Sequence, residues 1–178
     1  MDNNFSRNII KGRITESIFE QMFQEAGEFT VLPIGYEHTT PILAQYQHFV
    51  EVQKVLENIR NAPDFALISQ DKKQVYLVEV KYRRIISNEQ ILTIAKETIE
   101  RWDPCYLFIA SNNGFYFSPC NAVLSKNGEL EPLRESWINK ELQEKYLALL
   151  REFISWFFKF SDHHGKYLEY PLLLSPVV

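Results

Sequence analysis

The chain has 178 residues, a net charge of −4 and two cysteines, and 46% of its residues are hydrophobic. This length and composition indicate a single folded domain over residues 1–178, and they exclude a disordered tail, a disulfide scaffold and a cysteine zinc site. The acidic balance provides no long-range attraction for nucleic acid, so such binding would need a local basic patch.

The sequence pattern contains no targeting or membrane signal. Residues 1–8 look like a loose polar leader, and the apolar run near 147–160 is interrupted by charged residues. A secretory signal and a membrane-spanning helix both need an uninterrupted apolar segment. We therefore expect a cytoplasmic protein that does not bind membranes.

Helix and strand patterns alternate in the first third of the chain. A helix is predicted over 12–27, because apolar residues recur there at helical spacing. Residues 29–36 follow as a strand that is kinked at Pro33 and Gly35. A long amphipathic helix then begins at Pro41 and ends near residue 60. It either covers the core or recognises a substrate.

A β-hairpin is predicted next. Two apolar segments rich in β-forming residues, 63–68 and 75–84, flank a short polar turn at 70–74. Ser87 and Gln90 then have the spacing of a capping box, which predicts a helix that ends near Trp102.

The last predicted strands and the terminal helix follow. The uninterrupted apolar run 105–110 suits a strand buried on both faces, so strand, helix and strand form a parallel crossover. An edge strand at 115–119, irregular chain at 121–136 and a terminal helix at 140–158 complete the pattern. The apolar face of that helix is wide, so the helix either packs deeply or presents a partner surface.

Three ionisable residues interrupt the apolar hairpin. Glu79 and Lys81 are two residues apart, so they point to the same face of a strand. The midpoint between Asp64 and Glu79 falls within the polar turn, and a symmetric hairpin therefore sets these two carboxylates opposite each other. Carboxylates this close repel each other unless a cation or a proton lies between them, and Mg²⁺ or Mn²⁺ suits clustered oxygens. The other interpretation is an edge hairpin with solvated charges.

At these residues the sequence resembles the PD-(D/E)XK nuclease superfamily. The resemblance lies in Pro63-Asp64 and in Glu79-Val80-Lys81 on consecutive strands, and it covers roughly residues 12–110. It implies an α/β, restriction-endonuclease-like three-layer core, in which a mixed sheet lies between helices in the order helix, three strands, helix, strand. The core would span about 12–118, with a helix inserted after the first strand and a C-terminal helical extension over about 119–178. Resolvase-like and restriction-type members are the most similar.

The resemblance also implies a mechanism. Asp64, Glu79 and the Val80 carbonyl would bind Mg²⁺ or Mn²⁺, and Lys81 would orient or help deprotonate the attacking water, since the pKa of a lysine near a metal can be lowered. Glu16, on the first helix, would complete the metal site or is otherwise a solvated helix charge. Arg83 and Arg84, which follow the lysine, would contact substrate phosphates.

The expected activity is that of a Mg²⁺-dependent nuclease, an endonuclease acting on DNA, and a homodimer is compatible with it. The alternative is an inactive module that keeps the nuclease fold and binds protein or nucleic acid. The acidic net charge and the aromatic terminal helix favour this alternative. The intact set of Asp64, Glu79 and Lys81 argues against it, because a module without catalysis has little reason to keep a repulsive pair.

Overall fold

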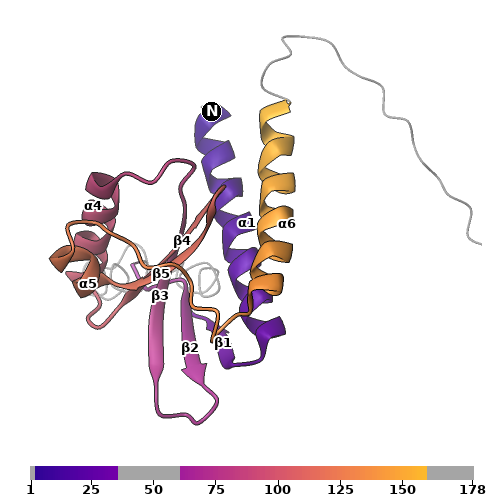
Figure 1. The fold of residues 1–178 in the computed structure, drawn as a ribbon. Helices are drawn as coiled ribbons and strands as arrows, with labels where there is room; N and C mark the ends of the chain where they lie inside the picture. Colours follow the sequence, from indigo (N-terminus) through magenta and orange to yellow (C-terminus); the bar gives the residue numbers. More distant parts are fainter. Residues whose placement is uncertain (1–2, 36–60, 160–178) are drawn as a thin grey trace, which may run out of the picture.

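The computed structural model of the protein describes residues 3–35 and 61–159 (Figure 1). The helix predicted from Pro41 and the tail from residue 161 lie outside the described residues. Among the residues that are described, no helix is both long enough and apolar enough to cross a membrane.

A mixed five-stranded sheet forms the centre of the molecule, with its strands in sequential order from β1 to β5. All neighbouring strands are antiparallel except β3 and β4, which are parallel. Helix α4, Asn88–Ile99, provides the crossover between these two strands, as the sequence predicts. The strands are β1 Phe29–Pro33, β2 Phe65–Ser69, β3 Val75–Tyr82, β4 Tyr106–Ser111 and β5 Gly114–Pro119.

Helices cover both faces of the sheet, so the fold is a layered α/β arrangement (Figure 1). Helices α1, Asn3–Ala26, and α6, Lys140–Lys159, lie side by side on one face. Helix α4 and the short α5, Cys120–Ser125, cover the other face.

The core on the α1 side is aromatic. The Phe19 ring lies 4.5 Å from that of Phe23 and 4.9 Å from that of Phe108, measured between ring centroids. Val78 and Val80 of β3 belong to this core. Because side chains alternate along a strand, Glu79 and Lys81 are directed towards the α4 side of the sheet.

The helix and strand positions differ from the predictions at four places. Helix α1 begins at Asn3, so the predicted loose leader is wrong. The helix continues through Gly12, because one glycine costs a helix only about 1 kcal/mol. The N-terminal part of α1 lies beside α6 (Figure 1). Helix α5 occupies part of the stretch predicted to be irregular. Strand β1 ends at Pro33, and α4 ends at Ile99 rather than near Trp102.

The predicted capping box is also not formed. Ser87 is the N-cap residue of α4, but its side chain makes no capping hydrogen bond. The backbone carbonyl of Ser87 instead accepts a hydrogen bond from the Ile91 N–H at 3.0 Å.

Candidate active site at the open end of the hairpin

Asp64 lies where β2 begins, and the end of β1 holds its backbone in place. The carbonyl oxygen of Asp64 accepts hydrogen bonds from the N–H groups of Ile34, at 3.0 Å, and Gly35, at 3.2 Å. A Cβ atom on Gly35 would lie 3.5 Å from the Asp64 Cα, which is an ordinary van der Waals contact. The chain after β1 therefore packs directly against the residue that carries the first carboxylate.

The hairpin register agrees with the sequence prediction. Phe65 pairs with Val78 and Ile68 pairs with Val75, and one more step along the same register sets Asp64 opposite Glu79. Strand β2 begins at Phe65, so the N–H of Val80 lies beyond the last pair of the ladder. Oδ2 of Asp64 accepts this N–H at 2.7 Å, and the carboxylate thus takes the place of the missing carbonyl of a neighbouring strand.

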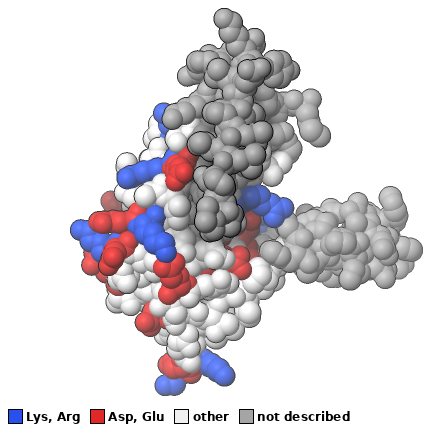
Figure 2. Space-filling view, turned by 90° about the vertical axis from the view of Figure 1, so that its right-hand side faces the viewer, with Lys and Arg blue, Asp and Glu red and all other residues white. Residues whose placement is uncertain are grey.

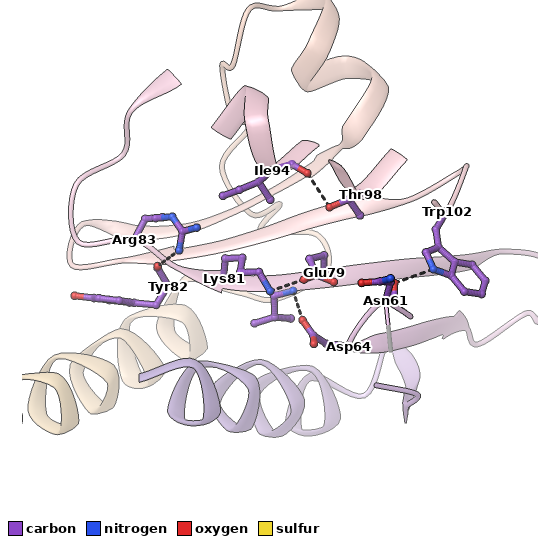
Figure 3. A network of polar contacts seen from close by, with 10 residues as sticks. Asn61, Asp64, Glu79, Lys81, Tyr82, Arg83, Ile94, Thr98 and Trp102 are labelled. Carbon is purple, nitrogen blue, oxygen red and sulfur yellow. Dashed lines mark hydrogen bonds and ion pairs between the residues drawn. The ribbon is translucent and has the colours of Figure 1, made fainter. Parts of the chain in front are cut away.

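Glu79 and Lys81 form an ion pair on the same face of β3 (Figure 3). Oε1 of Glu79 accepts a hydrogen bond from Nζ of Lys81. The side chain of Glu79 is 19% exposed and that of Lys81 is 36% exposed. Both groups are therefore withdrawn from bulk solvent but remain accessible, which argues against the interpretation as a fully solvated hairpin edge.

Burial and charge shift the pKa values at this site. Burial and, next, the charge of Glu79 raise the pKa of Asp64 to about 7, although Lys81 and the Val80 N–H act in the opposite direction. Burial alone would lower the pKa of Lys81, but the charges of Glu79 and Asp64 outweigh it, so the pKa of Lys81 is raised. The two carboxylates therefore favour the protonated form of Lys81.

Glu16 lies close to the site and forms an ion pair with Arg13 on its own helix. Its side chain, on α1, is 27% exposed, and its Oε2 lies 4.0 Å from Nη1 of Arg13. Its charge adds a small upward contribution to the pKa of Asp64. No hydrogen bond joins Glu16 to Asp64 or Glu79 in the described part of the chain. Glu16 is thus an electrostatic neighbour of the pair and not a member of its hydrogen-bonded group.

Arg83 and Arg84 continue from the end of β3. Nη1 of Arg83 donates a hydrogen bond to the carbonyl of Tyr82 at 2.8 Å, and burial lowers the pKa of Arg83. The Arg83 backbone N–H is bonded to the Ala110 carbonyl at 2.9 Å, which ties the chain to β4. Arg84 lies close enough for its charge to act on the Tyr82 hydroxyl, whose pKa is nevertheless raised because burial dominates.

Asn112 and Arg151, to which the sequence pattern assigned no role, link this end of the sheet to α6. The Tyr82 hydroxyl lies 3.0 Å from Oδ1 of Asn112 and donates to it, and Nε of Arg151 donates to the Asn112 carbonyl at 2.8 Å. Asn112 is in the turn between β4 and β5, but its partners lie 30 and 39 residues away along the chain. No local spacing in the sequence indicates contacts of this range.

The described residues, those at the hairpin end included, contain no group of three metal-ligating side chains, and the face in Figure 2 shows no basic patch. Within residues 3–35 and 61–159, no three His, Cys, Asp or Glu side chains form a group that could hold a metal ion. On the face shown in Figure 2, acidic and basic side chains of the described residues are intermingled, and neither sign forms a continuous patch. Asp64 and Glu79 are therefore an acidic pair without a third metal-ligating side chain among the described residues.

Comparison with known proteins provides no identity for the chain. No family model, no curated protein and no solved structure matches it.

Proposed function

We propose that the protein is a metal-dependent nuclease that hydrolyses phosphodiester bonds in DNA. One observation carries the proposal. Asp64 and Glu79 lie at opposed positions at the open end of a hairpin, close enough for the charge of Glu79 to act on Asp64, and Lys81 pairs with Glu79. Two acids and one cation at this spacing are the catalytic group that the PD-(D/E)XK resemblance implies.

The order of the elements supports the same proposal. Helix α1, strands β1 to β3, helix α4 and strand β4 follow one another as in the restriction-endonuclease-like core, and the sheet is mixed. The acidic pair lies where β2 and β3 separate, next to the parallel junction between β3 and β4. Assignment of the fold to that specific topology is part of the proposal.

The residues at the hairpin end fit a divalent metal by their donor chemistry. The carboxylates of Asp64 and Glu79 are hard oxygen donors, and Mg²⁺ and Mn²⁺ prefer such ligands. Asp64 and Glu79 would hold the ion, with the Val80 carbonyl and Glu16 completing the set. When bound, the metal would neutralise charge on the phosphate and activate water.

The residues of the chain itself have distinct roles in this proposal. Lys81, which is protonated, orients the attacking water and stabilises negative charge on the phosphate through its ammonium group. Arg83 is half-buried, and within the described residues its guanidinium bonds to the carbonyl of Tyr82 through Nη1, so its other N–H groups can contact a substrate phosphate. Arg84 extends this cationic end of β3 towards solvent.

The decisive experiment compares two lysine variants on a panel of single-stranded, duplex, flap and four-way-junction DNA substrates with Mg²⁺ or Mn²⁺. Lys81→Ala should abolish cleavage and still bind the metal, because the lysine is not a ligand. Lys96→Ala removes the same charge from an exposed position on α4 and should cleave like the wild type. Arg83→Ala should weaken DNA binding and reduce its salt dependence more than it reduces turnover.

The result also separates the nuclease from the alternative function. Equal cleavage by the wild type and Lys81→Ala would contradict the catalytic role of the lysine. Absence of cleavage on every substrate, together with DNA binding that Arg83→Ala weakens, would favour an inactive module that binds nucleic acid.

A further inference from the structure

The two cysteines of the chain meet in the core on the α4 side. Cys105 precedes β4 and Cys120 begins α5, and both are buried, with 2% and 0% exposure. They belong to the cluster in which Ile91 and Val123 also pack. This chain has no other cysteine, so both of its thiols lie in the same cluster.

The backbone sets these residues opposite each other. The last ladder pair between β4 and β5 is Tyr106 with Pro119, and one further step along the register sets Cys105 opposite Cys120. The Cys120 N–H donates to the Cys105 carbonyl at 2.9 Å. Opposed residues in an antiparallel pair have Cα atoms about 4.5–5.5 Å apart, which lies within the range of about 4.4–6.8 Å that a disulfide spans.

The two thiols also contact each other directly, and the contact makes them unequal. The Cys120 S–H donates a hydrogen bond to Cys105; this bond lowers the pKa of Cys105 and raises that of Cys120. Thiol–disulfide exchange begins with a thiolate. Cys105 is therefore the better first nucleophile, and Cys120 is in position to react second.

We propose that Cys105 and Cys120 are a redox modification site. The two residues form a reversible disulfide with each other, and a small-molecule disulfide such as oxidised glutathione is the oxidant. The Cys105 thiolate attacks one glutathione sulfur, and the first reduced glutathione leaves. The Cys120 thiolate then attacks the Cys105 sulfur and releases the second. The two protein thiols are oxidised, one glutathione disulfide is reduced to two thiols, and the two thiol protons end on them. The site is independent of the proposed nuclease activity.

The test is a redox titration of the full chain. The protein is refolded from urea directly into buffers of graded reduced and oxidised glutathione, so that burial does not limit access to the thiols. The free thiols are then trapped by alkylation, and intact mass is measured. A parallel series remains in urea. We expect the folded chain to lose two hydrogens and to favour the disulfide at least about tenfold more than the unfolded chain, because the fold already closes the loop.

Two control variants and a melting curve complete the design. Cys105→Ala and Cys120→Ala should each form only a glutathione adduct, and the oxidised wild type should melt roughly 5–10 °C above the reduced form. A folded chain that favours the disulfide no more than the unfolded chain would overturn the proposal. Oxidation that yields only covalent dimers would overturn it as well.

Discussion

At the scale of single residues, Asp64 is held in a place that disfavours its charge, although the hydrogen bond from the Val80 N–H favours it. Its backbone carbonyl is tied to the end of β1 and its carboxylate to the Val80 N–H. Both contacts fix the position of the side chain, while burial and Glu79 raise its pKa to about 7. A residue held rigidly in an unfavourable charge state is typical of a functional site, because stability is given up there for function.

Asp64→Asn should remove the pH dependence that this residue imposes on stability. The folded-state pKa, about 7, lies above the ordinary value of 3.8, so the folded protein binds the proton more tightly than the unfolded chain. The free energy of unfolding of the wild type therefore falls as the pH rises from about 4 to 7. From pH 5 to pH 8 the loss should be about 2 kcal/mol, allowing for screening at a partly exposed group.

Urea unfolding at pH 5 and pH 8 measures this effect. Asp64→Asn should be more stable than the wild type at pH 8, and by a larger margin there than at pH 5. Glu97→Gln, on the exposed face of α4, is the control and should keep the wild-type slope. Parallel pH profiles for the wild type and Asp64→Asn would show that Asp64 titrates normally in the folded protein.

At the scale of helices and strands, α6 settles one question that the sequence left open. Its apolar face packs against α1 and the sheet, so deep packing is confirmed for the residues that the structure describes. Leu150 is 0% exposed and Ile154 2% exposed, whereas Phe153 is 48% exposed. Lys145 and Tyr146 also donate hydrogen bonds to Glu25 of α1, at 2.6 and 2.8 Å. Helix α6 is therefore part of the domain core.

Replacing two α6 side chains, three residues apart, by alanine should lower the free energy of unfolding by unequal amounts. Leu150→Ala should lower the free energy of unfolding by about 2–5 kcal/mol, because it removes fully buried methyl groups and leaves a cavity. Phe153→Ala should cost less than about 1 kcal/mol, because the ring is half in solvent. Chemical denaturation of both variants tests this. Equal losses would mean that the helix does not dock on α1 through the Leu150 side.

At the scale of the whole molecule, the sheet divides two kinds of core. Aromatic rings fill the α1 and α6 side, and a smaller aliphatic and thiol cluster fills the α4 and α5 side. Strand β3 lies between them, and its alternation directs Val78 and Val80 to the first core while Glu79 and Lys81 face the other way. Glu79 and Lys81 are therefore carried by a strand whose opposite face is fully packed, and this packing gives the two side chains a rigid support.

Divalent metal should stabilise the whole domain through this site. For a dissociation constant of about 1 mM, ~10 mM Mg²⁺ adds roughly 1.4 kcal/mol to the free energy of unfolding, which is about 2–5 °C in melting temperature for a domain of this size. Thermal melts with EDTA, Mg²⁺ or Mn²⁺ test this. The shift should appear in the wild type and be absent from Asp64→Asn; equal shifts in both proteins would locate the ion elsewhere.

The sequence by itself determined the features that depend on neighbours along the chain. The helical period predicted α4 and most of α1 and α6, and short apolar segments rich in β-forming residues predicted the five strands. The polar turn between two apolar segments set the register that places Asp64 opposite Glu79. The two-residue spacing put Glu79 and Lys81 on one face. Local patterns predicted less well at Ser87 and at residues 3–11 and 120–125, where packing against other elements outweighs propensity.

Only the tertiary structure decided the properties that need distant partners. The bond from the Val80 N–H to Asp64 depends on where β2 leaves the ladder, and the pKa of Asp64 depends on burial, so neither can be read from spacing. The same holds for Asn112, which joins β3 to α6, and for Cys105, which looks like an inert strand residue until Cys120 is placed beside it. Each of these depends on contacts that form only when the sheet and its two helical layers have assembled.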